Sequence, residues 1–345
     1  MRRFAPLLAL LAAVPSAVAD DEPVATVDLA WRAGPSPSLD RPGGAVAVAS
    51  SGALYVLGGV GEAATAVEKF VPSADGGTWS DEPAMPTGRE SAVVAEVGGD
   101  LYVIGGTRPS HGGQDDHATA QIANVERYRT KERRWETLPS LHVARDVASV
   151  AVFEGRIFVV GGFLDKESID STEVFDPEHA DQGWTLLPSK MPVPVRSAAY
   201  ATVGGKLFVI GGCSGYGREP CRQRRVQVYD LASDAWAVLD ESNWMPTGRH
   251  FSGQGAVAIG SRIVVFGGAT DFSKTIYARV EILDTATGTW SVGTPMPTGR
   301  KSTACALLGD VLYVVGGHST TPAPGRPPRG GRVVELVDLS KLRGS

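Results

Sequence analysis

Several features that mark large classes of protein are missing from this sequence. No apolar run after the first 20 residues reaches the roughly 18 residues that a membrane-spanning helix requires. No segment shows sustained helical periodicity, so the chain is predicted to be all-β. The formal net charge of −5 disfavours nucleic acid as a partner.

The sequence motifs of the common enzyme classes are also missing. There is no G-x-S-x-G elbow, no H-E-x-x-H, no Walker A and no dinucleotide glycine fingerprint between a strand and a helix. These absences favour a binding protein over an enzyme, and no cofactor is predicted.

One short stretch is present in six copies. Each copy has four aliphatic, β-branched or aromatic residues followed by Gly-Gly, and the copies lie about 50 residues apart. They are 54–59, 101–106, 157–162, 207–212, 263–268 and 312–317. Two glycines cost about 2 kcal/mol relative to alanine in a helix, so each copy is predicted to be a strand that ends in a tight turn. A period of this length is typical of a repeat architecture.

The N-terminus reads as an export signal. A basic Met1-Arg2-Arg3 precedes an apolar segment, 4–14, and the small residues Ala17-Val18-Ala19 form a cleavage site. Residues 1–19 are therefore predicted to be a signal peptide, and the protein to be secreted or periplasmic. Asp20 rather than a cysteine stands directly after the cleavage site, which disfavours a lipid anchor, so no membrane association is expected after cleavage. Residues 20–345 have no Pro/Ser-rich linker and are predicted to form a single domain.

Two other residues recur in step with Gly-Gly. Tryptophan appears as Trp31, Trp79, Trp135, Trp184, Trp236 and Trp290. An arginine follows each of them, as Arg41, Arg89, Arg145, Arg196, Arg249 and Arg300. Alternating segments such as Val125-Glu126-Arg127-Tyr128 add a third strand, so each repeat is predicted to hold four strands.

Gly-Gly, Trp and Met-Pro-x-x-Arg, as in Met85-Pro-Thr-Gly-Arg89, together resemble kelch repeats over almost the whole of residues 20–345. The resemblance implies a six-bladed β-propeller with four antiparallel strands in each blade. Trp31 has no Gly-Gly before it, and the last Gly-Gly has no tryptophan after it. The Trp31 strand is therefore expected to complete the last blade, and each Trp to pack between neighbouring blades. A monomer is expected.

Strand geometry predicts which segments share a face. The loops after Gly-Gly and the connections that carry the arginines should emerge on the same side. That side would gather Glu90, Asp146, His250 and Lys301, together with loops 107–123, 163–171, 213–225, 269–277 and 318–332. The resemblance implies that ligands bind there, and through the six arginines. The alternative is that the arginines pair with backbone carbonyls or an acidic neighbour.

The predicted function is a binding module for a protein or carbohydrate ligand, possibly anionic because Arg218, Arg222, Arg224 and Arg225 crowd one loop. A second hypothesis is similarity to exported six-bladed kelch mutarotases of sialic acid, with Glu90 or His250 as the acid or base. Galactose oxidase also carries kelch repeats, but its copper site needs a Tyr-His pair that this sequence lacks.

Two smaller clusters remain. His111, Asp115, Asp116 and His117 offer metal-binding side chains, although such a stretch is more often a solvated loop. Cys213 and Cys221 lie in one loop of an exported chain, which favours a disulfide. Cys305 is predicted to be a buried, inert thiol.

Overall fold

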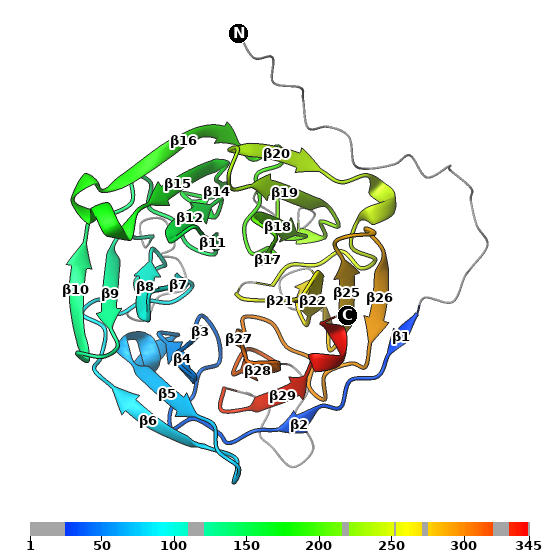
Figure 1. Cartoon of the computed structure of the whole chain (residues 1–345), viewed down its shortest axis with the longest axis horizontal. Helices are drawn as coiled ribbons and strands as arrows, with labels where there is room; N and C mark the ends of the chain where they lie inside the picture. The colour runs from blue at the N-terminus through cyan, green and yellow to red at the C-terminus, as the bar shows by residue number, and fades with distance from the viewer. Residues whose placement is uncertain are drawn as a thin grey trace.

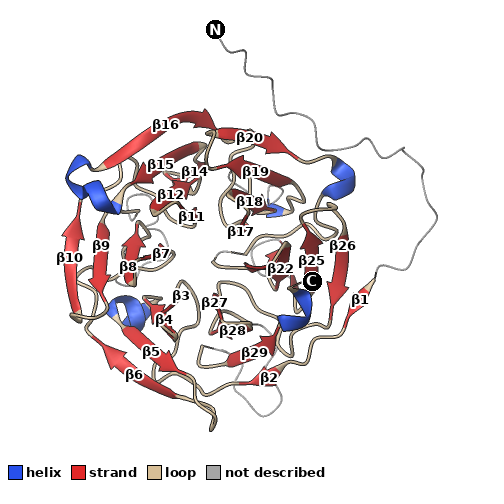
Figure 2. Cartoon of the chain, viewed as in Figure 1, coloured by secondary structure: helices blue, strands red, loops and turns tan. Residues whose placement is uncertain are grey.

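The computed structural model describes residues 25–109, 121–215, 221–251, 253–270, 275–319 and 331–343. Six antiparallel four-stranded blades are arranged around a central axis, and among these residues helix occurs only as short 3-10 turns (Figures 1 and 2). The prediction of an all-β, six-bladed propeller is therefore confirmed. No helix among the described residues is long and apolar enough to cross a membrane. The predicted signal peptide, 1–19, lies outside the described residues.

Each blade has the same strand order from the axis outwards: the strand after the arginine, the Gly-Gly strand, the third strand of the repeat, which we call the Val-Glu strand, and the Trp strand. Blades 1 to 3 consist of β3 (Val46–Ser50), β4 (Ala53–Leu57), β5 (Val67–Val71) and β6 (Thr78–Glu82); β7 (Val93–Val97), β8 (Asp100–Ile104), β9 (Val125–Arg129) and β10 (Arg134–Leu138); and β11 (Ser149–Phe153), β12 (Arg156–Val160), β15 (Ser171–Phe175) and β16 (Trp184–Lys190). Blades 4 to 6 consist of β17 (Ala199–Val203), β18 (Lys206–Ile210), β19 (Val226–Asp230) and β20 (Ala235–Val238); β21 (Ala256–Ile259), β22 (Arg262–Phe266), β25 (Val280–Asp284) and β26 (Trp290–Gly293); and β27 (Ala304–Leu308), β28 (Val311–Val315), β29 (Val334–Asp338) and β2 (Arg32–Ala33).

The remaining elements are short. They are β1 (Thr26–Val27), the hairpin strands β13 (Phe163–Leu164) and β14 (Glu167–Ser168), the hairpin strands β23 (Ala269–Thr270) and β24 (Thr275–Ile276), and the 3-10 turns η1 (Gly61–Thr65), η2 (Pro177–Gln182), η4 (Glu241–Asn243) and η6 (Ser340–Leu342). Both hairpins lie in loops that follow a Gly-Gly strand, so these loops extend the blades at one end only.

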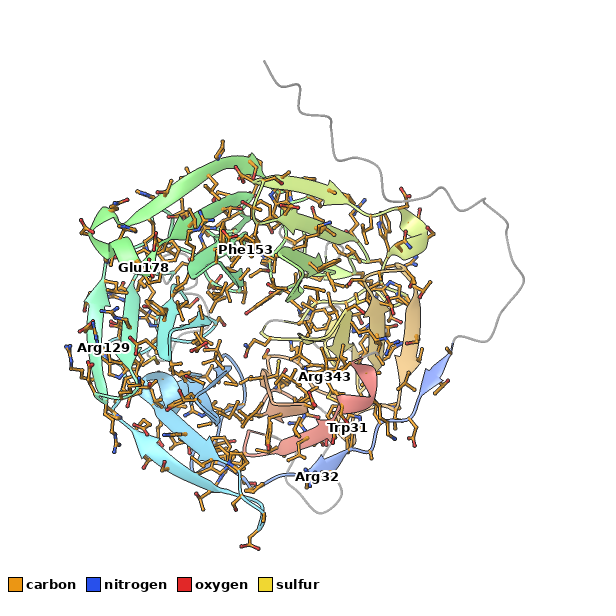
Figure 3. The ribbon with its side chains drawn as sticks, in the orientation of Figure 1. Trp31, Arg32, Arg129, Phe153, Glu178 and Arg343 are labelled. Carbon is orange, nitrogen blue, oxygen red and sulfur yellow. A yellow bond between two sulfur atoms is a disulfide. The ribbon has the colours of Figure 1, made fainter. Side chains whose placement is uncertain are left out.

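The ring is closed by the N-terminal segment, as predicted. β2 pairs antiparallel with β29, with Arg32 opposite Leu336. Trp31 itself lies one residue before β2, and its indole N–H donates to the Thr294 carbonyl, 3.0 Å away in the connection after blade 5. Figure 3 shows Trp31 and Arg32 at the periphery of the ring. β1 adds a parallel pairing to β26, which the sequence did not predict. The N-terminal segment thus holds blades 5 and 6 together.

The tryptophans pack between blades, which confirms their predicted role. The Trp135 indole in blade 2 donates to the Pro83 carbonyl of blade 1 at 2.8 Å, and the Trp184 indole in blade 3 donates to the Pro139 carbonyl of blade 2 at 3.0 Å. These rings also pack against an aromatic side chain of their own blade: Trp135 is tilted against Tyr128 with centroids 4.9 Å apart, and Trp184 stacks on Phe175. The repeat therefore supplies both the hydrogen bond and the apolar contact at these junctions.

The Gly-Gly doublets are required by the backbone conformation and by close contact with the next blade. Gly105 and Gly106 both have positive φ, 62° and 98°. A Cβ on Gly105 would lie 2.4 Å from the Arg145 carbonyl oxygen of the next blade. A larger residue would therefore push the neighbouring blade away, which explains why the doublet recurs.

Candidate functional site

The predicted gathering of segments on one face of the propeller is present. The residue after the repeated arginine forms a β-bridge with the residue after Gly-Gly in five blades: Glu90 with Thr107, Asp146 with Phe163, Arg196 with Cys213, His250 with Ala269, and Lys301 with His318. We call this side the ring face. It lies at the ends of the strands opposite to the tight turns such as 98–99 and 204–205.

All six predicted arginines are buried, and five of them share one arrangement. Each makes an ion pair with the glutamate of the Val-Glu strand in the same blade and donates to the carbonyl of the first glycine. The pairs are Arg41–Glu68, Arg89–Glu126, Arg145–Glu173, Arg249–Glu281 and Arg300–Glu335. The pairing with acidic neighbours and backbone carbonyls is confirmed, whereas ligand contact through these arginines stays a prediction.

Blade 3 shows the geometry in detail. Arg145 Nη2 lies 2.7 Å from Glu173 Oε1, Nη1 donates to the Gly161 carbonyl at 2.9 Å, and Nε donates to the Val143 carbonyl at 3.3 Å. Glu173 Oε1 also accepts the Val143 backbone N–H at 3.1 Å. Burial lowers the pKa of Arg145, while Glu173 opposes that shift. The pair therefore neutralises itself inside the blade.

Arg196 is not the sixth member of this set, which corrects the alignment of the repeats made from sequence. Counting from Met191, the position of the repeated arginine is held by Val195, and the Val195 carbonyl accepts the Gly162 N–H as the Arg145 carbonyl accepts the Gly106 N–H. Arg196 occupies the next position, which faces the ring. The spacing from Met191 was the signal that identifies this offset.

Blade 4 has neither the arginine nor the glutamate of the ion pair. The glutamate position holds Gln227, which is buried. Its Oε1 accepts the Val193 N–H and its Nε2 donates to the Val193 carbonyl, each at 2.9 Å. One neutral amide thus makes the two hydrogen bonds that Glu173 and Arg145 make with Val143 in blade 3. At this position the substitution leaves no buried charge without a partner.

Arg196 instead joins a polar cluster with blades 2 and 3. Its guanidinium lies 3.9 Å from the centre of the Phe163 ring. Asp146 Oδ2 accepts from Thr107 Oγ1 at 2.6 Å and from Gln121 Nε2 at 3.4 Å. Burial raises the pKa of Asp146, and its hydrogen bonds and Arg196 counteract this shift. Charged side chains of adjacent blades therefore interact across the ring face.

Charge is divided around the ring face. Glu90 and Asp146 come from the adjacent blades 2 and 3, while Arg196, His250 and Lys301 come from blades 4, 5 and 6. The 213–225 loop adds Arg222 and Arg224, which are exposed, to the basic side. Arg225 stacks over Trp244, with its guanidinium 4.9 Å from the ring centre. The ring face thus has carboxyl groups from blades 2 and 3 and, across from them, a basic sector made of Arg196, Arg222, Arg224, Arg225 and Lys301.

The predicted acid or base residues differ in accessibility. His250 is 2% exposed, whereas Glu90 is partly exposed and lines a hollow of about 390 Å³ on the ring face. Lys301 and His318 line the same hollow. Of the two, only Glu90 is placed to meet a small molecule from solvent.

The remaining predicted sites have different outcomes. Cys213 and Cys221 form a disulfide, and Cys305 is a buried free thiol whose pKa burial raises. The described residues contain no group of three or more histidine, cysteine and acidic side chains able to hold a metal. His111, Asp115, Asp116 and His117 lie outside the described residues, so that metal hypothesis stays open.

Comparison with known proteins gives a consistent result. The family described as the KLHDC2/KLHL20/DRC7 Kelch-repeats domain matches residues 94–317. Kelch-like protein terF of Aspergillus terreus is 27% identical over 268 residues, which span 72% of this chain and 55% of that protein. Kelch-like protein 26 of Danio rerio is 25% identical over 252 residues, 72% of this chain and 39% of that protein. The chain therefore spans about half or less of the length of these curated relatives.

One solved structure, that of YjhT, resembles the chain along most of its length. The TM-score is 0.69, with 19% identity over 87% of this chain and 95% of the other. At this identity the likeness shows a shared fold and carries no residue roles.

Proposed function

The chain belongs to the kelch-repeat family, and we propose that it is an exported binding module that captures a protein partner on its ring face. A kelch propeller is a typical protein-binding module. The observation that supports this particular face is that Glu90, Asp146, Arg196, His250 and Lys301 hold the same bridge position there in five separate blades. A rigid scaffold with polar loops at one end is a common arrangement for recognition.

The partner's chemistry follows from the division of charge. Arg222 and Arg224 are exposed on the basic sector, and guanidinium groups bind carboxylates with two parallel hydrogen bonds. An acidic protein segment therefore suits this sector better than a basic one. A carbohydrate carrying carboxylates would use the same groups, and a glycan array separates it from a protein partner.

The double substitution Arg222→Glu/Arg224→Glu is expected to weaken capture of the partner at least roughly tenfold, because attraction becomes repulsion. The measurement is quantitative pull-down from the medium or periplasm, followed by titration of the captured protein. Lys131→Glu/Lys206→Glu makes the same change of charge on the opposite side of the propeller. If both double variants lose capture equally, the ring face is not the binding surface.

Export and a monomeric state belong to the same proposal. They rest on the signal-like residues 1–19 and on closure of the ring within one chain. Fractionation should find a processed chain outside the cytoplasm, and light scattering should give the mass of one chain. A full-length cytoplasmic product would overturn the export proposal.

A sugar-acid mutarotase is the second candidate, and the position of Glu90 in the ring-face hollow favours it. Opening of a sugar ring needs an acid/base group, for which Glu90 has access to solvent, and a cation for the carboxylate, for which Lys301 is available. We expect the wild type to accelerate the rotation change of freshly dissolved α-sialic acid, and Glu90→Gln to reduce that acceleration at least about 100-fold. A polarimetric rate equal to that of buffer would exclude this activity.

A further inference from the structure

A chain of backbone hydrogen bonds runs around the axis at the ring face. The residue two positions after the repeated arginine donates its N–H to the equivalent carbonyl of the preceding blade. The bonds are Ser91 to Gly44 at 2.7 Å, Val147 to Ser91 at 2.9 Å, Ser197 to Val147 at 3.1 Å, Phe251 to Ser197 at 2.8 Å, and Ser302 to Phe251 at 2.8 Å. Among the described residues no equivalent bond joins Gly44 of blade 1 to Ser302 of blade 6. We call this place the open junction.

The sequence of blade 1 explains why the junction is open. Arg41 is followed by Pro42-Gly43-Gly44, and one more residue separates the arginine from the inner strand here than in blade 2. Pro42 has no N–H, and the two glycines let the segment run close to its neighbours: a Cβ on Gly43 would lie 3.2 Å from the Ser302 Cβ, and one on Gly44 2.8 Å from the Glu90 Cβ. Blades 1 and 6 therefore touch at this level, Gly43 against Ser302, without a backbone hydrogen bond between them.

The two blades are held together one layer deeper by a side chain from blade 5. The Gln254 amide oxygen accepts the N–H groups of Ala47 and Cys305, at 2.8 and 3.0 Å. Its nitrogen donates to the Ala47 carbonyl at 2.8 Å. This amide bridges β3 and β27, so the opening above it does not depend on a ligand for stability.

The open junction forms the hollow of about 390 Å³. Its walls come from three blades: 42–44 from blade 1, Glu90 and Ser91 from blade 2, and Lys301, Ser302 and His318 from blade 6. This volume is within the range of about 300–1,000 Å³ that is typical of sites for small molecules.

Lys301 gives the hollow its chemistry. Its side chain is partly exposed and, within the described part of the chain, forms no hydrogen bond or ion pair. Burial lowers the pKa of Lys301, and no carboxylate counteracts that shift. The Glu90 carboxylate borders the same hollow from the other side of the blade 1 segment. The Lys301 ammonium, which makes no ion pair with another described residue, therefore lines one hollow with a carboxylate from a different blade.

We propose that the open junction binds a small amino acid, with its carboxylate directed to Lys301 and its ammonium directed to Glu90. A ligand with only a carboxylate or only an ammonium would use one wall of the hollow and leave the other unused. A molecule that carries both groups gains from both walls, and this difference gives the selectivity. This inference goes beyond the capture of a protein partner and does not depend on it.

The test titrates the full chain by NMR with glycine, β-alanine, 4-aminobutyrate and 5-aminopentanoate, which differ only in the separation of the two charges. We expect an optimum within this series, with acetate, glucuronate and propylammonium at least roughly tenfold weaker than the best member. Lys301→Met and Glu90→Gln should each weaken that member roughly 10- to 100-fold, whereas Lys301→Arg should retain most of the binding.

Lys131→Met removes a distant exposed lysine and serves as the matched control, with unchanged binding expected. Circular dichroism establishes that each variant is folded. The proposal is overturned if no member of the series binds below about 10 mM. It is equally overturned if glucuronate binds as tightly as the amino acids, a result that would favour the mutarotase, or if Lys301→Met binds as the wild type does.

Discussion

Replacing Arg145 with valine is expected to lower the free energy of unfolding by about 3–5 kcal/mol, because Glu173 would remain buried without its counter-charge. The carboxylate would keep its hydrogen bonds from the His142 and Val143 backbone but lose the Arg145 guanidinium. Chemical denaturation of the two purified proteins measures the difference. Arg145 is far more buried than an exposed arginine such as Arg134, whose replacement should cost less than about 1 kcal/mol.

Blade 4 supplies the matched control for this prediction. The double variant Arg145→Val/Glu173→Gln recreates the Val195 and Gln227 arrangement in blade 3, where Val143 occupies the position of Val193. It should be more stable than Arg145→Val alone by about 1–3 kcal/mol, since the introduced glutamine would make both hydrogen bonds to Val143. If the two single substitutions are simply additive, the arginine and the glutamate do not act as a pair.

The fold was predictable because each repeated residue is required either by a backbone conformation or by a contact between neighbouring blades. Gly105 and Gly106 are required by close approach of the next blade, and Trp135 by the contact with Pro83. Such requirements recur from blade to blade, so they leave a periodic signal in the sequence. The same reasoning predicted closure by the Trp31 segment. The N-terminus has a Trp strand without a Gly-Gly strand, and the last repeat has a Gly-Gly strand without a Trp strand, so each supplies what the other lacks.

The candidate site was predicted only in part, since its residues are the ones that depart from the repeat. Arg196 was grouped with the five arginines that pair with a glutamate because its distance from Trp184 resembles theirs from their tryptophans, although its spacing from Met191 differs by one residue. Beneath the open junction, Gln254 of blade 5 reaches β3 and β27 in two other blades. No local pattern around Gln254 encodes those long-range contacts.

Removal of residues up to Ala33 is expected to destabilise the ring by about 5 kcal/mol or more, which approaches the whole stability of many domains. The segment contributes the buried Leu29 side chain, worth about 1.5–3 kcal/mol, and several hydrogen bonds of about 0.5–1.5 kcal/mol each. Those bonds include Leu29 N–H to Thr294 Oγ1 at 2.9 Å and the Trp31 indole to the Thr294 carbonyl at 3.0 Å. Thermal unfolding of the truncated and intact chains measures the loss.

Complementation shows whether the loss comes from closure. A synthetic peptide of residues 25–36 should restore the melting temperature of the truncated chain in a concentration-dependent way, because it can pair with β29 and β26. A peptide with Leu29 and Trp31 both replaced by alanine keeps the backbone donors and acceptors but should restore much less. A truncated chain that melts within about 2 °C of the intact protein would show that the N-terminal segment does not close the propeller.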